Sequence, residues 1–535
     1  MASAGSLGVG SAGLARLAGV SPMLHRTSPM HVALLHTALA FSPPEAAVDA
    51  PLTGVVCSIL DHGAVGDNHT LNTPAIQAAI DACHLAAPEG STVLVPSGAY
   101  RTASIHLRSN LRLHLASGAG LYGSSDPSDY SVSLQWFGGR HVANFDALIR
   151  GANLTNVSVT GSNGAALPGN ASIIDGVGWR WWCWAKAEGS GMPLYQPWCR
   201  EFNPNNETLP NQGRPRLINI FNSSGVTLSG FTAQNSPQWT VHVQNSRNVV
   251  IRTLTVLSPR AVGNTDGIDP ESSENVLVED SYVDVGDDAV SIKSYNITPD
   301  GGVSTGIPCR RVMMRRLTLR SRNWCIGSGT FGGVSEVLFE DSTIGTPGDA
   351  SAPVPWALKF KSHRWFSGPI ENITVRRIAI GVVGSTPWMY PTGRGGVWQL
   401  GLTYGGKEPS PWSGLFPRVR NVTFEDVMVD AADYAGQIHG LNDSCFEHLT
   451  FRNVSIRGGS AASGLSADEG GWSCAYVQQS TFVTESVTPP FGSCALCTLS
   501  VRHEKRHPRF SDFTVTPRSP APPTPHILYS YRRRV

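Results

Sequence analysis

The most regular feature of the chain is a short motif in which one residue, most often Asn, precedes two apolar positions separated by one residue. Alternation with a period of two predicts β-strands. Successive motifs from Gly225 to Glu336 begin 23, 27, 36 and 25 residues apart. Strands inside repeats of this length are typical of parallel β-solenoids, because each coil buries alternate side chains against its neighbours. The motifs are Asn110–Leu113, Asn156–Val159, Gly225–Leu228, Asn248–Ile251, Asn275–Val278, Arg311–Met314, Glu336–Phe339, Asn372–Val375, Asn421–Phe424 and His448–Phe451.

We therefore predict an all-β fold, a single-stranded right-handed parallel β-helix. Leucine-rich repeats have similar periods, but their Leu-x-x-Leu-x-Leu framework is absent, and a propeller would require more regular blades. The longer intervals between motifs are expected to be loops that project from one face.

One segment before the first repeat has helical periodicity. Apolar residues stand at i, i+3, i+4 and i+7, at Ile76, Ala79, Ile80 and Cys83. Asn72 precedes the segment as a polar cap, with Pro74 at the first helical position. We predict a short N-terminal helix, preceded by a strand at 55–60, that covers the open end of the strand stack.

The two ends of the chain differ in composition from the middle. Residues 1–50 contain a short apolar run at 32–41 and are interpreted as a secretory leader, removed or disordered in the mature protein. Residues 498–535 are rich in Arg and Pro and are predicted to be a disordered tail. Residues 51–497 would form the catalytic domain, with a Trp-rich insertion at 176–215. Its tryptophans either line a sugar-binding wall or cover the edge of the solenoid.

Composition narrows the class of protein. The net charge is +1 with 15% charged residues, which gives no electrostatic footprint for nucleic acid. No apolar run approaches the roughly 18 residues of a membrane span, so we expect neither nucleic acid nor membrane as a partner. Ten cysteines, without metal-site spacing, favour disulfides, with Cys57–Cys83 and Cys474–Cys494 as candidate pairs. Eleven glycosylation sequons also indicate secretion, at Asn68, Asn153, Asn156, Asn170, Asn206, Asn222, Asn296, Asn372, Asn421, Asn442 and Asn453.

Two acidic motifs supply the candidate chemistry. They are Asn264–Asp269 and Gly286–Asp288, and 21 residues separate Asp266 from Asp287. If one repeat lies between them, their carboxylates stand on adjacent coils, about 4.8 Å apart. Glycosidic hydrolysis requires one carboxylic acid and one carboxylate, and crowding of like charges raises the pKa of one member. Asp287 and its neighbour Asp288 would point to opposite faces of a regular strand, so a bend beside Gly286 is expected.

Four motifs in this order resemble a known family. Asn264-Thr265-Asp266, Gly286-Asp287-Asp288, Ile326-Gly327-Ser328 and Lys359-Phe360-Lys361 are similar to the Asn-Thr-Asp, Gly-Asp-Asp, Gly-Ser and Arg-Ile-Lys motifs of the polygalacturonases, glycoside hydrolase family 28. Further segments resemble its plant-type branch, and the similarity spans roughly residues 55–495. The segments are Gly63–Asp67, Val95–Tyr100 and Trp472–Cys474 before Pro489, Pro490 and Cys494.

The resemblance implies a secreted cell-wall hydrolase of α-1,4-galacturonosyl bonds in pectin, a monomer without cofactor or metal. It implies that Asp287 is the general acid and that Asp266 and Asp288 activate water, with inversion at the anomeric carbon. Stacked carboxylates about 5 Å apart would by themselves suggest retention. Lys361 matches the family's lysine for the galacturonate carboxylate, and Asn264 is expected to orient Asp266.

Three positions add to or depart from the family pattern. Lys359 stands where the family usually has Arg, which removes a bidentate fork for a carboxylate. Arg322 occupies the place of a histidine found in many members, and either binds a uronate carboxylate or is a solvated loop charge. Lys293 resembles the lysine of the branch's Ile-Lys-Ser segment and is a further candidate for substrate binding.

Other functions remain open on the same solenoid. The first is hydrolysis of rhamnogalacturonan or xylogalacturonan in place of plain galacturonan, with endo or exo action undecided. The second is a pectate lyase, which uses Ca²⁺ and a basic residue. The third is a non-catalytic wall-binding solenoid, against which the presence of Asp266, Asp287 and Asp288 argues.

Overall fold

The computed structural model describes most of the region between residues 54 and 497. The predicted leader at 1–50 and tail at 498–535 lie outside the described residues, as do Trp198 and the sequon residues Asn206, Asn296 and Asn442. The described ranges are 54–137, 140–162, 170–187, 199–202, 213–295, 306–362, 368–386, 395–404, 417–441, 444–462, 471–478, 481–492 and 494–497.

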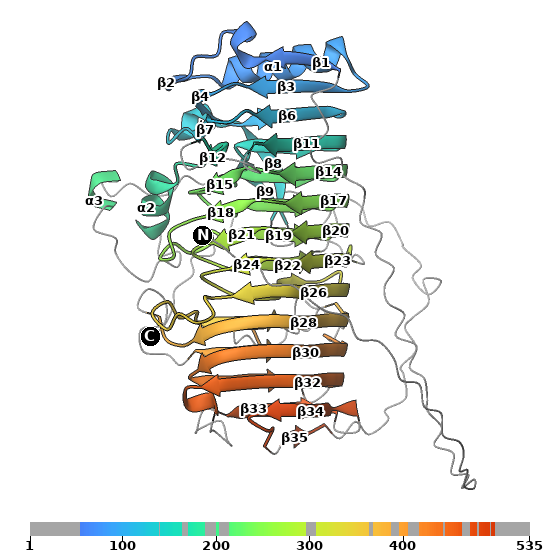
Figure 1. The fold of residues 1–535 in the computed structure, drawn as a ribbon. Coiled ribbons are helices and arrows are strands. Elements are labelled where there is room, and N and C mark those ends of the chain that lie inside the picture. Colours follow the sequence, from blue (N-terminus) through green and yellow to red (C-terminus); the bar gives the residue numbers. More distant parts are fainter. Residues whose placement is uncertain are drawn as a thin grey trace, which may run out of the picture. The chain divides into compact units, whose positions relative to one another are not determined.

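Parallel strands stack coil upon coil in the described region (Figure 1). The strands pair into three ladders: each coil from β5 to β24 contributes one strand to each ladder, and beyond β24 the shorter ladder merges into the longer one at β26. The predicted parallel β-solenoid is therefore confirmed. The ladder that carries the candidate site consists of β5 (Ile105–His106), β10 (Ile149–Ala152), β13 (Ile218–Phe221), β16 (Val241–Gln244), β19 (Ile268–Glu271), β22 (Val290–Ser294), β25 (Trp324–Thr330), β27 (Trp356–Lys361), β29 (Gly396–Gly401), β31 (Tyr434–His439), β33 (Trp472–Val477) and β35 (Ala495–Leu496).

Two further ladders complete the coils. The longer one consists of β1 (Val55–Ser58), β3 (Ser91–Val95), β6 (Leu111–Leu115), β11 (Thr155–Gly161), β14 (Ser224–Ser229), β17 (Arg247–Arg252), β20 (Glu274–Glu279), β23 (Cys309–Arg315), β26 (Val334–Ile344), β28 (Ile370–Val383), β30 (Val419–Ala432), β32 (Phe446–Gly458) and β34 (Val483–Thr488). The shorter one consists of β2 (Asp67–Leu71), β4 (Gly98–Thr102), β7 (Ala119–Gly123), β12 (Ile173–Asp175), β15 (Thr232–Gln234), β18 (Thr255–Leu257), β21 (Tyr282–Asp284) and β24 (Thr318–Leu319), and it ends on β26.

The repeated motif aligns in register from coil to coil. Its first apolar residue occupies one column of the longer ladder, and the residue before it has a positive φ in every motif, from Asn110 (56°) to His448 (52°). Asn tolerates this left-handed conformation better than most residues, which explains its frequency at the motif start. The column is Leu111, Val157, Val226, Val249, Val276, Val312, Val337, Ile373, Val422 and Leu449.

The solenoid interior is an apolar core with aromatic stacking near its C-terminal end. Alternate residues of the strands point inward and are buried, as in Val276 and Val278 of β20. Phe424 and Phe451 on successive coils stack with ring centroids 4.9 Å apart, and Trp398 lies edge-on to both. Such a core holds the coils in fixed register, which in turn fixes the side chains that project from the outer faces.

The N-terminal helix is confirmed as α1 (Thr73–Ala86), which packs against β1, β3 and the 3₁₀ helix η1 (Ile59–His62) at one end of the stack (Figure 1). The predicted apolar face is the buried one: Ile76, Ala79, Ile80 and Cys83. Asn72 occupies the N-cap position, but its side chain bonds Val65 and Thr70 and not the first turn of the helix. The strand expected at 55–60 ends at Ser58, where η1 begins.

The Trp-rich insertion forms α2 (Trp179–Ala187) and α3 (Cys199–Phe202) beside the solenoid (Figure 1). Trp181 and Trp182 are fully buried, and Trp184 is 3% exposed. The indole nitrogen of Trp182 donates to Ser236 O at 3.0 Å. Trp181 meets Tyr130 edge-to-face. These three tryptophans therefore cover the solenoid edge, and they do not present flat faces to a sugar.

A short hairpin and four disulfides complete the architecture. The hairpin pairs β8 (Val132–Phe137) with β9 (Arg140–Phe145) in antiparallel order. Both candidate disulfides, Cys57–Cys83 and Cys474–Cys494, are present, together with Cys183–Cys199 and Cys445–Cys497. Cys309 and Cys325 are buried free thiols.

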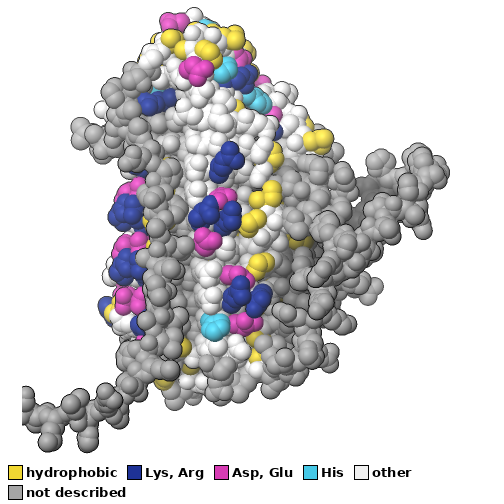
Figure 2. All heavy atoms as spheres, turned by 90° about the vertical axis from the view of Figure 1, so that its right-hand side faces the viewer, with side chains coloured by type: hydrophobic (Ala, Val, Ile, Leu, Met, Phe, Trp, Pro, Cys, Tyr) yellow, Lys and Arg dark blue, Asp and Glu magenta, His cyan; other side chains and the backbone are white. Residues whose placement is uncertain are grey.

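Charged side chains on the longer ladder pair across coils. Arg316 Nε lies 2.6 Å from Asp280 Oδ1, and Arg377 Nε lies 2.6 Å from Asp341 Oδ1. Figure 2 shows positive and negative side chains gathered in mixed clusters on this side of the molecule. Exposed pairs of this kind contribute only about 0–1 kcal/mol each, and they leave no extended patch of one sign in this view. Within the described residues, no helix is long and apolar enough to cross a membrane.

Candidate active site

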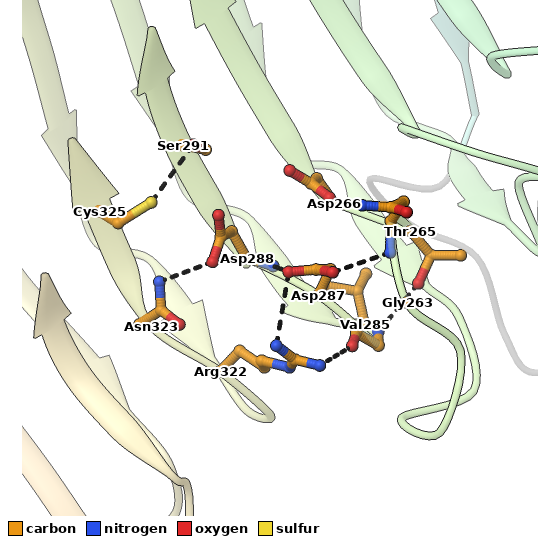
Figure 3. A network of polar contacts seen from close by, with 12 residues as sticks. Gly263, Thr265, Asp266, Val285, Asp287, Asp288, Ser291, Arg322, Asn323 and Cys325 are labelled. Carbon is orange, nitrogen blue, oxygen red and sulfur yellow. Dashed lines mark hydrogen bonds and ion pairs between the residues drawn. The ribbon is translucent and has the colours of Figure 1, made fainter. Parts of the chain in front are cut away.

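The two acidic motifs lie on adjacent coils, as their spacing predicted. Asp266 ends the loop between β18 and β19, and Asp287 and Asp288 lie between β21 and β22. Gly267 N donates to Asp288 O at 2.9 Å, so the backbone directly beyond Asp266 pairs with Asp288. Figure 3 shows the side chains of Asp266, Asp287 and Asp288 next to one another. The expected bend is present at Gly286-Asp287, and the strand resumes at Val290.

Asp287 is the most exposed of the three carboxylates, with 20% of its side chain accessible. Its Oδ2 accepts from Asn264 N at 2.8 Å, and its Oδ1 accepts from Asp288 N at 2.9 Å. Arg322 Nη1 lies 3.4 Å from Oδ1 (Figure 3). Donors on both oxygens fix the orientation of this side chain.

Asp288 is buried and held by a lysine and an amide. Lys361 Nζ contacts its Oδ2, and Asn323 Nδ2 donates to its Oδ1 at 3.0 Å. Burial by itself raises the pKa of this carboxyl, but Lys361 and then Lys359 outweigh it and lower the pKa well below the usual range. The two lysines therefore favour the ionised form of Asp288.

Asp266 has the opposite electrostatic setting. Burial raises its pKa well above the usual value, Lys293 opposes this, and Asp269, Asp287 and Asp288 raise it further. Lys293 Nζ lies 3.1 Å from Asp266 Oδ2. Asp266 Oδ1 is buried without a hydrogen-bond partner among the described residues.

The two lysines of the Lys359-Phe360-Lys361 motif have different surroundings. Lys361 is bound to Asp288. Lys359 makes no hydrogen bond or ion pair within the described part of the chain, and its ammonium lies 5.8 Å from the centre of the Trp356 ring. Burial, together with the charge of Lys361, lowers the pKa of Lys359 to about 8. Lys359 is therefore a buried cation that acts on Asp288 through its charge and makes no direct ion pair within the described residues.

Arg322 is one of the buried cations of the site. Its Nη2 donates to Gly286 O, its Nη1 faces Asp287, and only 7% of the residue is exposed. The guanidinium is thus not a solvated loop charge. It holds the bend that carries Asp287 (Figure 3).

Asn264 also lies elsewhere than expected. Its backbone N–H donates to Asp287, and its side-chain Oδ1 accepts from Arg214 Nη2 at 3.1 Å. We expected it to orient Asp266, but its described hydrogen bonds are to Asp287 and Arg214.

Sequence reasoning missed three residues that shape the site. Arg214 donates to Pro237 O at 3.0 Å and to Gly263 O at 3.2 Å, and so fixes the loop that ends in Asp266. No sequence signal pointed to it, because it stands near the end of an insertion. Asp269 ends the first acidic motif and Asn323 directly follows Arg322, but their partners in space depend on the register of the coils.

The site is therefore a cluster of carboxylates with unlike charge states, bordered by cations. Within the described ranges, no three His, Cys, Asp or Glu side chains converge as metal ligands do. An ionised carboxylate, a buried carboxyl that resists ionisation and a more exposed third carboxyl suit acid–base chemistry on one bond.

Comparison with known proteins agrees with this chemistry. A family model described as "Glycosyl hydrolases family 28" matches residues 134–306, and one described as "Rhamnogalacturonase A/epimerase, pectate lyase-like" matches residues 56–159. A protein of Vitis vinifera named "Probable polygalacturonase" is 30% identical over 442 residues, which are 81% of this chain and 79% of that protein. The chain belongs to glycosyl hydrolase family 28.

Other relatives of this family member carry related names. An exo-poly-alpha-D-galacturonosidase of Dickeya chrysanthemi is 27% identical over 61% of this chain and 55% of its own length. The crystal structure of an exopolygalacturonase from Thermotoga maritima superposes with a TM-score of 0.64 at 25% identity, and covers 81% of this chain and 92% of that one. The predicted fold class, the right-handed parallel β-helix of this family, is thereby confirmed.

Proposed function

We propose that this protein is a pectin-degrading glycoside hydrolase that cleaves α-1,4-galacturonosyl bonds with inversion. The observation that carries the proposal is the set of three carboxylates on two adjacent coils (Figure 3), together with the buried cations Lys361 and Lys359 that act on Asp288. Family membership and the names of the relatives support the same reaction and substrate.

The surroundings of the three carboxylates support distinct roles. Asp287 would donate its proton to the leaving oxygen, since it is the most exposed and its two backbone donors stabilise the carboxylate that forms. Asp288 would take the proton of the attacking water, because Lys361 keeps it ionised. Asp266 would position that water through its free Oδ1.

We further propose that the protein acts as a monomer outside the cell, at the cell wall. Four disulfides support secretion, because such bonds persist in oxidising compartments. The sequons and the apolar run at 32–41 support it as well.

The substrate class is tested by product analysis on defined polysaccharides. Polygalacturonic acid, rhamnogalacturonan and xylogalacturonan are each incubated with the protein, and the released oligomers are separated by length. We expect the highest rate on polygalacturonic acid. A higher rate on rhamnogalacturonan or xylogalacturonan would replace the proposed substrate with that polymer. A series of oligomers of different lengths would indicate endo action, and release of monomer alone would indicate exo action.

The role of Lys359 gives a separate prediction. Lys359→Met is expected to raise KM for polygalacturonate about 10- to 100-fold, since a charge-assisted hydrogen bond contributes about 1.5–3 kcal/mol. A smaller change in kcat is expected. Because the pKa of Lys359 is lowered to about 8, the ammonium loses its charge as pH rises through that value. The wild-type KM should therefore rise above about pH 8, and that of the variant should not.

Steady-state kinetics across this pH range are the measurement. Lys359→Arg is the matched variant, because it retains a cation that does not titrate in the range. Its KM should lose the alkaline rise. An unchanged KM in Lys359→Met would contradict the assignment of Lys359 to the substrate carboxylate.

A further inference from the structure

Lys293 lies directly beside Asp266, the carboxyl that we propose positions the attacking water. Its ammonium is 3.1 Å from Asp266 Oδ2 and also contacts Asp269 Oδ2. The residue is 3% exposed, and its Nζ lies 4.0 Å from the centre of the Trp239 ring. Two carboxylates and an aromatic face thus surround this cation.

This arrangement differs from that of a cation that receives a substrate. A uronate carboxylate needs a cation that is not already paired with a carboxylate. Lys359 has no ion pair within the described residues, whereas Lys293 is paired with both Asp266 and Asp269. We infer that Lys293 is a positioning residue for Asp266, which it holds in a buried bridge shared with Asp269, and not a contact of the sugar. The inference rests on the proposed hydrolase function, and it replaces the substrate-side role suggested by the sequence.

The bridge to Lys293 fixes the orientation of the Asp266 side chain. Lys293 belongs to β22, and Asp269 to β19 on the preceding coil, so both partners stand on rigid, paired strands. Lys293 occupies Oδ2 of Asp266, while Oδ1 has no partner among the described residues. A side chain held by one oxygen presents the other in a constant direction, which positioning of an attacking water requires.

The bridge also controls the ionisation of Asp266. Burial opposes ionisation of Asp266, and Lys293 is the largest influence in the other direction. Burial also opposes the charge of Lys293, but Asp269 and Asp266 outweigh it and raise the pKa of the lysine, which stays charged. Asp269 competes for the same cation. The other titratable or charged groups that interact electrostatically with Asp266, Asp269 or Lys293 are Arg214, Arg216, His242, Glu271, Asp287, Asp288, Tyr295 and Cys325.

The test compares two variants that should move the pH profile in opposite directions. Lys293→Met removes the cation, so Asp266 ionises less readily and the acidic limb of the kcat profile should move to higher pH by about one unit or more. Asp269→Asn removes the competing carboxylate and leaves Lys293 to Asp266, so the acidic limb should move to lower pH. KM for polygalacturonate should change less than twofold in both variants.

Three outcomes would overturn the inference. A raised KM with an unmoved acidic limb in Lys293→Met would restore the substrate-contact role. If the acidic limb of the kcat profile stayed in place in both variants, or moved in the same direction in both, the bridge would not act on Asp266. If Lys293→Met does not fold, the charge-balanced double variant with Asp269→Asn replaces it, and its kcat should stay below that of Asp269→Asn alone.

Thermal unfolding separates this inference from the proposed function. If wild-type protein hydrolyses no pectic polymer, the proposed function fails, but the bridge is still measurable. Without Lys293, the pKa values of Asp266 and Asp269 in the folded state lie further above those in the unfolded state. The unfolded state then releases these protons more readily than the folded state, so stability is lost as pH rises. The Tm of Lys293→Met should therefore fall progressively below that of wild type from about pH 4 to about pH 7. A constant difference would overturn the bridge itself.

Discussion

Replacement of Asp287 by Asn is expected to lower kcat on polygalacturonate by about 10²- to 10⁴-fold, the contribution typical of a general acid. The amide cannot donate a proton to the leaving oxygen and leave a carboxylate behind. The side chain is partly exposed and lies on a bend between β21 and β22, so the Tm should change little. Initial rates of reducing-sugar release, with thermal unfolding in parallel, are the measurement.

Asp284→Asn is the matched control for this change. Asp284 ends β21, three residues before Asp287, and has a similar exposure, with 22% of its side chain accessible. It bonds Arg260 at 2.8 Å and takes no part in the site. The control should keep its rate within about twofold, since surface substitutions change little. If Asp287→Asn retained a wild-type rate, Asp287 would not be the acid.

Asp288→Asn is expected to reduce both activity and stability. It removes the ionised carboxylate that accepts the proton of water, so the rate should fall by about 10²- to 10⁴-fold. It also leaves Lys361 buried without its counter-ion, and loss of one partner of a buried pair costs about 3–5 kcal/mol. Urea unfolding should therefore separate this variant from Asp287→Asn, whose free energy of unfolding should stay near that of wild type.

A double variant tests the physical reason for the lost stability. Asp288→Asn combined with Lys361→Met removes the stranded charge together with its former partner, so most of the lost free energy of unfolding should return. Activity should remain low, because the base is still absent. If Asp288→Asn were as stable as wild type, Lys361 would not depend on Asp288 for charge compensation.

The coil stack could be predicted from the sequence because its determinants are local. The alternation of apolar residues within each repeat predicts its own strand. Asn is frequent at motif starts such as Asn110, because the backbone there has a positive φ, which Asn tolerates. The spacing between Asp266 and Asp287 then placed two acidic motifs on neighbouring coils. Intervals between motifs are enough for this step, because in a solenoid one repeat is one coil.

The ion-pair and hydrogen-bond partners of the charged residues in the site could not be predicted in the same way. Arg214 reaches the site from an insertion of irregular structure, and Arg322 turns inward to Gly286 and Asp287. Lys293 and Lys359 belong to similar motifs, yet one is saturated by two carboxylates and the other makes no direct ion pair within the described residues. These differences depend on side-chain directions across coils, which neither composition nor spacing encodes.

We expect the carboxylates of the two adjacent coils to direct hydrolysis of a galacturonosyl bond by water. Mass spectrometry of the products formed from polygalacturonic acid in isotopically labelled water, with and without a chelator, distinguishes this reaction from elimination. Saturated oligomers or monomer with one labelled oxygen at each new reducing end are expected under both conditions, and far less of them with Asp287→Asn. Unsaturated products without label, formed only when the chelator is absent, would instead identify a lyase.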